Sequence, residues 1–435
     1  MNDPIVPFPK FGAGTGLHRV KFIADAMELD LAAFAPRACA VTGSNGKGSV
    51  AAMTASILAA EKTNVGLFTS PHLYSIRERF RIDGDPIDEN ALAAHWEKVL
   101  KACARYQEDH ASDQIGGFEF LFLVAASWFA EQRCEFIVWE AGIGGRLDTT
   151  RLIRARQAAL VSLDFEHTKL LGETLEEIAY QKIDIAPPGG KIFIGPCAGD
   201  LKARLEIHAA LNGVEPVFVH ENDAWCDSGD SAHIDVDLRG AVLRIAPPLA
   251  GPHQRSNAAI AAHLAYDILR ADFVSDQNAR SAVIAGLAAT HWPGRLEKIE
   301  TSPPIVVDVG HTPDGIRLAR AGFEERHAPC VLVCGVSQDK SADAIIAQLA
   351  PGFRVIICAA ALHKGAPPAE IAAMARVANP DAEIIVAEDM KDARNTALHR
   401  AQALNGSVYV AGGLFLAAEF AASHRGLDPA RLRFF

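Results

Sequence analysis

The most constraining feature of the sequence is an apolar run that leads into a glycine-rich loop and then into a helical pattern. Ala38 to Val41 is typical of a buried strand, Gly43 to Gly46 of a tight loop, and Gly48 to Met53 of the start of a helix. In α/β folds this order places backbone N–H groups of the loop and the helix N-terminus around an anion. The pattern therefore predicts an α/β fold with a phosphate site at this loop.

Two side chains of the same segment suit the triphosphate of ATP. Lys47 supplies a point charge to the outer phosphates, and the Ser49 hydroxyl can ligate magnesium. The spacing from Gly43 to Lys47 is shorter than in the general phosphate-loop pattern. A purely structural turn is the alternative, but such a turn needs neither the lysine nor the hydroxyl. The residues predicted to contact the nucleotide here are Gly43, Asn45, Gly46, Lys47, Gly48 and Ser49.

Polar residues also follow two other strand-like runs. Glu140 ends the apolar run Phe136 to Trp139, and Ser70 follows the run Val65 to Phe68. Ligands of open α/β sheets bind at the carboxyl ends of parallel strands, and carboxylates and hydroxyls suit magnesium. Each residue alone is more often an ordinary strand-end carboxylate or a turn residue. Their shared position in one crevice makes Glu140 a candidate magnesium ligand beside Ser49, and lets Ser70 offer its hydroxyl to the metal or to the substrate.

A further polar segment follows the strand-like run Ala159 to Leu163. It contains Glu166 and His167, and Lys182 lies farther along the chain. A single histidine is more often a structural residue than a ligand, so this segment by itself leaves both interpretations open.

Composition narrows the classes of function. The chain has 435 residues, enough for two cores, and its formal net charge of -11 argues against a general binder of nucleic acid or anionic membranes. The eight cysteines are scattered without a CxxC pair, which favours reduced thiols over disulfides or a zinc site. No segment resembles a signal peptide or reaches the roughly 20 apolar residues of a membrane span. We therefore expect a soluble protein of the cytoplasm.

Strand-like and helical runs alternate along the chain, which predicts a parallel sheet covered by helices on both faces. Trp292-Pro293-Gly294-Arg295 interrupts this pattern, so we expect one domain at 1–295 and a smaller, doubly wound α/β domain at 296–435. The segment from His220 to Pro248 is expected to be an antiparallel edge or an excursion, with a strand at Ala241 to Ile245 and a helix following at Gln254 to Arg270. Other expected strands are Ile192 to Ile194, Val217 to Val219, Ile305 to Asp308, Val331 to Cys334, Val355 to Cys358, Ile384 to Val386 and Val408 to Ala411.

Taken together, the ordered motifs resemble the folylpolyglutamate synthase and dihydrofolate synthase branch of the Mur ligases. The resemblance extends over nearly the whole chain. Its motifs are residues 11–12 and 16–19, 43–49, 69–72 with 78–79, 142–148, 167 with 171–174, 251–254 with 257–258, 293–295, 308–313, and 335 with 339–340.

The resemblance implies an ATP-dependent amide ligase. Such enzymes transfer the γ-phosphoryl group of ATP to a pteroate or folate carboxylate, and the amine of L-glutamate then displaces phosphate. It further implies two magnesium ions, small-molecule partners and a monomeric chain. By motif position, Asn257, Arg295, Asp308 and His311 would meet the nucleotide. His167 and Lys182 would join Lys47 as catalytic residues and would hold the second metal, with Lys182 carbamylated by carbon dioxide.

Three departures from the family pattern keep other functions open. First, the acidic residue that commonly precedes the lysine is replaced by Gln181, before Lys182, and an acidic residue stands instead at Asp184. Second, Thr312 replaces an asparagine of the family motif. Third, Gly412-Gly413 stands where the family usually has Gly-Ser. One alternative is therefore a related ligase that joins an amino acid or amine to a different carboxylate. A second alternative is a non-catalytic protein that uses ATP as a conformational switch.

Overall fold

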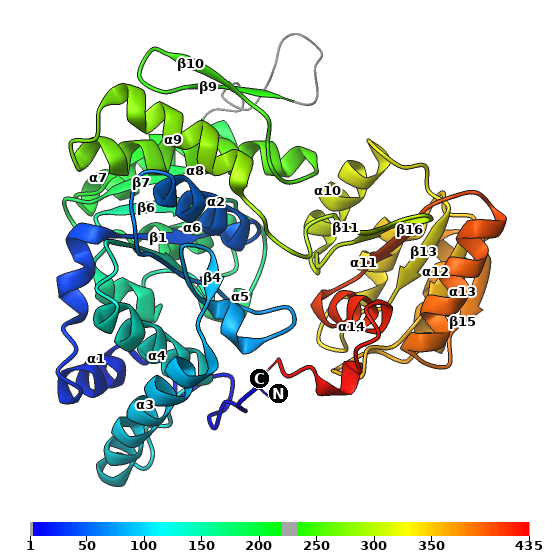
Figure 1. Ribbon diagram of the computed structural model, residues 1–435, viewed down its shortest axis with the longest axis horizontal. Coiled ribbons are helices and arrows are strands. Elements are labelled where there is room, and N and C mark those ends of the chain that lie inside the picture. Colours follow the sequence, from blue (N-terminus) through cyan, green and yellow to red (C-terminus); the bar gives the residue numbers. More distant parts are fainter. Residues whose placement is uncertain (1–2, 220–232, 435) are drawn as a thin grey trace.

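A computed structural model describes residues 3–219 and 233–434. It has two lobes, each built on a mostly parallel sheet with helices on both faces (Figure 1). This arrangement confirms the predicted fold class.

The sheet of the first lobe has the strand order β4-β3-β2-β5-β1-β6-β7-β8, in which β3 and β4 are antiparallel to the strands they pair with. Strand β1, which leads into the phosphate loop, lies between β5 and β6. The polar residues that follow these strands are therefore brought to one edge of the sheet. The strands are β1 (Ala38–Thr42), β2 (Val65–Phe68), β3 (Phe80–Ile82), β4 (Asp85–Pro86), β5 (Phe136–Glu140), β6 (Gln157–Leu160), β7 (Lys191–Ile194) and β8 (Glu215–Phe218).

Alternate residues of the first sheet face two separate cores. In β5, Phe136 and Val138 join the core under α2, α8 and α9, whereas Ile137 and Trp139 join the core formed with α1, α3 and α4. A strand that is apolar at every position is thus explained by helices on both faces. The helices are α1 (Leu17–Ala26), α2 (Lys47–Ala59), α3 (Glu89–Asp109), α4 (Gly117–Glu131), α5 (Thr168–Leu171), α6 (Leu175–Ile183), α7 (Gly199–Leu211), α8 (Pro252–Ala271) and α9 (Asp276–Ala289).

The sheet of the second lobe has the order β11-β12-β16-β13-β14-β15, with only the pairing of β11 antiparallel among these strands. Helices α10, α11 and α12 cover one face, and α13 and α14 cover the other. The strands are β11 (Glu297–Thr301), β12 (Pro304–Val307), β13 (Val331–Cys334), β14 (Val355–Cys358), β15 (Glu383–Val386) and β16 (Val408–Ala411). The helices are α10 (Pro313–Glu324), α11 (Ala342–Leu349), α12 (Pro368–Ala378), α13 (Met390–Ala403) and α14 (Leu414–His424).

Several predicted boundaries are corrected by the structure. Strand β6 ends at Leu160 and does not continue to Leu163, because the next residues turn to the phosphate loop, where the Ser162 carbonyl accepts a hydrogen bond from the Ser44 N–H (2.9 Å). Between 233 and 248 the chain forms a separate antiparallel pair, β9 (Ile234–Asp237) and β10 (Val242–Ile245), and not an edge of the main sheet. The part of this predicted excursion at 220–232 lies outside the described residues.

Candidate active site

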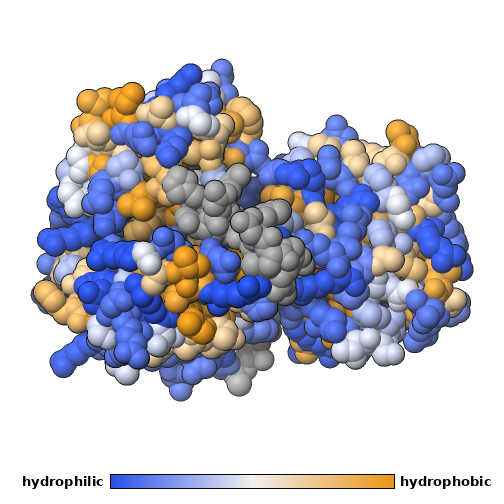
Figure 2. All heavy atoms as spheres, turned by 90° about the horizontal axis from the view of Figure 1, so that it is seen from above, coloured by the Kyte–Doolittle hydropathy of each residue, from blue (hydrophilic) through white to orange (hydrophobic). Residues whose placement is uncertain are grey.

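A cleft of about 850 Å³ lies between the lobes and is lined by residues of both. Seen from above, the two lobes are separate masses whose surfaces are mostly hydrophilic, with scattered apolar patches (Figure 2). The first lobe contributes the phosphate loop and the segments that follow β2, β5 and β6, and the second contributes the segments after β12 and β13. All the residues predicted for nucleotide and metal line this cleft except Gly43 and Lys182, which are bonded to the cleft residues Lys47 and Glu166, respectively.

The phosphate loop is tightly constrained. Gly46 has a φ of 83° and directly precedes α2, and a Cβ at this position would lie 2.9 Å from Asn257 Oδ1. Only glycine tolerates both conditions. The Lys47 ammonium folds back over the loop and donates to the carbonyls of Gly43 (2.7 Å) and Ser44 (3.2 Å). The ammonium group thus lies over the backbone carbonyls of the loop, and a bound phosphate would replace these carbonyls as its partner.

Helix α8 packs against the phosphate loop and the start of α2. Ser49 is fully buried, and its hydroxyl accepts a hydrogen bond from Gln254 Nε2 (3.3 Å). The same glutamine accepts from Asn257 Nδ2 (2.8 Å). Asn257 is therefore held beside the loop, as its predicted contact with the nucleotide requires.

Glu140 and Ser70 meet at the start of α2. The Ser70 N–H donates to Glu140 Oε2 (2.9 Å), and that same oxygen lies 3.5 Å from the position of a Cβ built on Gly48. Burial raises the pKa of Glu140 to about 7, against the opposing effect of Lys47. A bound cation here would favour the ionised carboxylate.

Lys182 is buried and forms an ion pair with Glu166, with Nζ and Oε1 2.6 Å apart. Burial, together with the charge of Lys47, lowers the pKa of Lys182 to about 8. Asp184 does not replace the missing acid, because it pairs with Arg146 (2.7 Å) and His208 (2.8 Å). In the sequence, Glu166 stood out only as part of the polar segment with His167, and its pairing with Lys182 was not predicted.

His167 follows Glu166 in a left-handed backbone conformation (φ 44°) and lines the cleft. Desolvation by the surrounding protein lowers the pKa of its ring, although Glu166 opposes the shift. The histidine is therefore neutral at pH 7, as a metal ligand must be.

The second lobe presents Arg295, Asp308 and His311 to the cleft. Asp308 is buried and accepts hydrogen bonds from the N–H groups of Leu296 (3.1 Å) and Gly310 (2.7 Å). The His311 ring is accessible from the cleft, yet desolvation and the charges of nearby cations lower its pKa to about 4. His311 is thus an uncharged hydrogen-bonding group at pH 7.

Thr312 makes a direct contact between the lobes. Its hydroxyl lies 3.3 Å from Asn45 Oδ1 of the phosphate loop and also accepts from the Gly315 N–H (3.1 Å). The residue that departs from the family pattern therefore both caps α10 and contacts the phosphate loop.

Comparison with known proteins identifies the family. Residues 294–414 match the model of the Mur ligase glutamate ligase domain. The folylpolyglutamate synthase of Lacticaseibacillus casei is 32% identical over 323 residues, which cover 73% of this chain and 74% of that protein. The chain belongs to the folylpolyglutamate synthase family. The dihydrofolate synthase/folylpolyglutamate synthase of Bacillus subtilis is 29% identical over 332 residues, 73% of this chain and 74% of that protein.

One relative is much longer than this chain, and another has been solved with bound nucleotides. A probable bifunctional folylpolyglutamate synthase/dihydropteroate synthase of Haloferax volcanii is 31% identical over 90% of this chain, which spans only 47% of that protein. Among solved structures, the Mycobacterium tuberculosis folylpolyglutamate synthase complexed with ADP and AMPPCP has a TM-score of 0.81 at 26% identity, covering 95% of this chain and 96% of that one. The family and its nucleotide complexes agree with the predicted ATP site.

The donor set at the phosphate loop suits magnesium better than a transition metal. In the described part of the chain, no three His, Cys, Asp or Glu side chains gather closely enough to hold a metal by themselves. Magnesium commonly takes one or two protein oxygens and completes its shell with water and phosphate oxygens. The Ser49 hydroxyl and the Glu140 carboxylate beside the loop fit that pattern.

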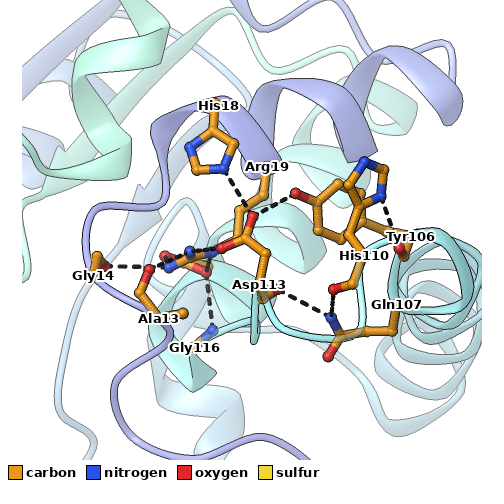
Figure 3. Close-up of polar contacts among 10 residues, drawn as sticks. Ala13, Gly14, His18, Arg19, Tyr106, Gln107, His110, Asp113 and Gly116 are labelled. Atoms are coloured by element: carbon orange, nitrogen blue, oxygen red, sulfur yellow. Dashed lines mark hydrogen bonds and ion pairs between the residues drawn. The ribbon is translucent and has the colours of Figure 1, made fainter.

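A buried arginine holds another wall of the cleft in place. Arg19 is fully buried and forms two hydrogen bonds with Glu119 (2.8 and 2.6 Å) and one with Asp113 (2.7 Å), as Figure 3 shows in part. It also donates to the carbonyls of Ala13 (2.7 Å) and Gly14 (3.3 Å). Phe11, Gly12, Gly14, Thr15 and Gly16 line the cleft, so Arg19 fixes the position of that wall.

Replacing Arg19 with methionine is expected to lower the free energy of unfolding by about 3–5 kcal/mol, because Glu119 would keep a buried charge without its partner. Urea unfolding followed by circular dichroism measures this change. Lys21→Met is the matched control, since Lys21 forms an exposed ion pair with Asp25 on the same helix and should cost no more than about 1 kcal/mol. Equal losses in the two variants would contradict a structural role for the buried pair.

Proposed function

We propose that this chain ligates L-glutamate to the carboxylate of a pteroate or folate at the expense of ATP. The observation that carries the proposal is the convergence of Lys47, Ser49, Glu140 and Glu166 in one cleft between two α/β lobes, with Lys182 paired to Glu166. The L. casei and B. subtilis relatives, named for this activity, support it. Membership of this family of ligases disfavours a non-catalytic switch.

The proposed reaction proceeds in two displacements. An oxygen of the acceptor carboxylate attacks the γ-phosphorus of ATP, the bond to the β-phosphate bridging oxygen breaks, and ADP leaves. The glutamate amine then attacks the acyl carbon, loses a proton, and displaces phosphate that retains the acceptor oxygen. Lys47 and the N–H groups at the start of α2 would bind the transferred charge, and the cleft between the lobes would hold the reactants together.

We propose that Ser49, Ser70 and Glu140 hold a first magnesium ion, and that His167 and Lys182 hold a second once Lys182 is carbamylated. Magnesium would neutralise the phosphates and the charge that develops on the transferred group. A pKa of about 8 leaves part of the Lys182 amine neutral near pH 8, as reaction with carbon dioxide requires. Carbamylation would also replace the cation that pairs with Glu166 by an anionic carbamate. Glu166 would then have to move away from the carbamate or share a cation with it.

The nucleotide site would extend from the phosphate loop to Asn257 and, across the cleft, to Arg295, Asp308 and His311. We further propose that the lobes divide at residues 295 and 296, between α9 and β11. In the described residues, no helix combines the length and the apolarity needed to cross a bilayer. We propose that the chain acts as a monomer in the cytoplasm on small-molecule partners.

A substrate panel tests this proposal. Purified protein with Mg²⁺ and ATP should release ADP only when both L-glutamate and a dihydropteroate or reduced folate are present. Mass spectrometry should then find the acceptor enlarged by one glutamyl residue. Lys47→Ala should abolish the signal, which excludes a contaminating ligase. No glutamate-dependent ADP release with any of these acceptors would contradict the assignment.

A second candidate is a ligase of the same chemistry with another carboxylate as acceptor. It is favoured by Thr312, whose hydroxyl replaces the usual amide beside Asn45. The same panel, extended to other pterin and aromatic carboxylates, separates the two. Turnover confined to non-folate acids would establish the second candidate, and turnover confined to folates would exclude it.

A further inference from the structure

The last described residues of the second lobe reach back to the first. The red segment that follows α14 runs toward the first lobe in Figure 1. Phe434 is anchored in the second lobe, where its ring lies 4.8 Å from His363 and 4.7 Å from Phe415, centroid to centroid. It is only 4% exposed. We call Leu432–Phe434 the strap.

The strap is bound by a loop of the first lobe, residues 71–79, which we call the clasp loop. The His72 ring lies parallel to the Phe434 ring, with centroids 6.0 Å apart, and its Nε2 bonds the carbonyl of Arg433. Arg79 donates to the Phe434 carbonyl (3.4 Å) and to His72 Nδ1 (2.8 Å). Backbone and ring of the strap are therefore both engaged by the clasp loop.

The clasp loop is embedded in the second lobe as well. Leu73 belongs to the apolar core formed by β12, β13, β16 and α14, and the Tyr74 ring lies 4.6 Å from the Arg425 guanidinium. The Glu78 carboxylate accepts hydrogen bonds from the N–H groups of residues 73, 74 and 75 at 2.9 to 3.0 Å. Because these bonds hold the loop in one conformation, we expect the clasp loop to move together with the second lobe.

The other end of the clasp loop reaches the predicted metal site. The Arg79 carbonyl accepts from the Thr69 N–H (3.1 Å), and the adjacent Ser70 N–H donates to Glu140 (2.9 Å). The phosphate loop, in contrast, has no bond to the strap in the described residues. A shift of the strap would therefore be passed to Ser70 and Glu140 before it reached Lys47.

We propose that the strap is a tether between the lobes and that Phe434 is a positioning residue, which holds the clasp loop so that Ser70 and Glu140 face the phosphate loop. The tether supplies a connection in addition to the chain between α9 and β11. The position of the second lobe would thus decide whether the metal site is assembled, which restricts activation of the acceptor to the correct arrangement of lobes.

The test compares ADP binding with and without Mg²⁺ by calorimetry. In Phe434→Ala, the gain in ADP affinity that Mg²⁺ provides should fall by about tenfold or more, as when groups that orient metal ligands are removed, while binding without Mg²⁺ stays within about twofold of wild type. Phe434→Leu, which keeps the apolar bulk, should retain most of the gain. Phe273→Ala is the matched control because Phe273 lies in the first lobe and is 95% exposed.

A second variant guards against loss of folding. His72→Phe keeps an aromatic ring but removes the bond to the Arg433 carbonyl, and it should weaken the Mg²⁺-dependent gain in the same direction. An unchanged gain in folded Phe434→Ala, or in folded His72→Phe when the first does not fold, would overturn the proposal. A loss of equal size with and without Mg²⁺ would also overturn it, because that result indicates general disruption. ADP binding needs no acceptor, so these results are separate from the identity of the substrate, although the role in activation rests on the proposed function.

Discussion

Replacing Lys182 with alanine is expected to lower kcat by about 100- to 1000-fold, the scale seen when a preorganised charge is removed from a transition state. Lys182 is fully buried, and its Nζ lies 2.6 Å from Glu166 Oε1. Steady-state ADP release measures the loss. Lys98→Ala, a change at an exposed position of α3, should leave kcat within about twofold of wild type, as surface substitutions do.

Short carboxylic acids should partly restore the activity of Lys182→Ala, because acetate or formate can supply the oxygens of the missing carbamate. With labelled bicarbonate, a carbon-13 carbamate signal should be present in wild type and absent from the variant. The pKa of Lys182 is lowered to about 8, so the neutral amine increases as the pH rises from 7 to 9 and carbamylation should increase with it. Full activity in the alanine variant would exclude a catalytic role for Lys182. A loss of activity that short acids do not restore, with no carbamate signal in wild type, would contradict carbamylation and leave the ion pair with Glu166 as the role of the lysine.

Replacing Glu140 with glutamine should raise the Mg²⁺ concentration for half-maximal activity by about 10- to 100-fold or more, the range known even for residues that merely support a metal ligand. The free energy of unfolding should not fall, because burial penalises the charged form of this carboxyl and raises its pKa to about 7. The measurements are a Mg²⁺ titration of turnover and urea unfolding. Glu108→Gln, at an exposed position of α3, is the control. An unchanged Mg²⁺ requirement would remove Glu140 from the proposed metal site.

The parts of the fold that depend on local pattern were predictable from the sequence. Strands β2, β13, β14 and β16 begin and end where their apolar runs do, because helices on both faces bury every position. Strands β3, β4 and β11 were missed. Strands β3 and β4 have only three and two residues, and all three strands carry charged residues, so their existence depends on pairing with a neighbouring strand and not on their own pattern.

The position of site residues was predictable where they lie at or just beyond the carboxyl ends of strands. The structure brings Ser70 and Glu140 together beside the start of α2, as the rule that strand ends share one edge of a sheet leads one to expect, and their role as metal ligands stays a prediction. The partner of Lys182 was not predictable, since Glu166 reaches it from another segment and only the packed structure brings the two together. The insertion of Leu73 into the core of the second lobe could likewise not be predicted from the sequence, because a single leucine in a loop has no periodicity.

Transfer of oxygen-18 from the acceptor to phosphate is the most direct test of an ADP-forming folate ligase. The acceptor is a pteroate or folate whose reacting carboxylate carries oxygen-18 at both positions, incubated with ATP, Mg²⁺ and L-glutamate. Each phosphate released should contain one labelled oxygen, in equal amount to the glutamylated product, because the acyl phosphate passes its bridging oxygen to phosphate. Unlabelled phosphate, or phosphate released without glutamylated product, would contradict the proposed reaction.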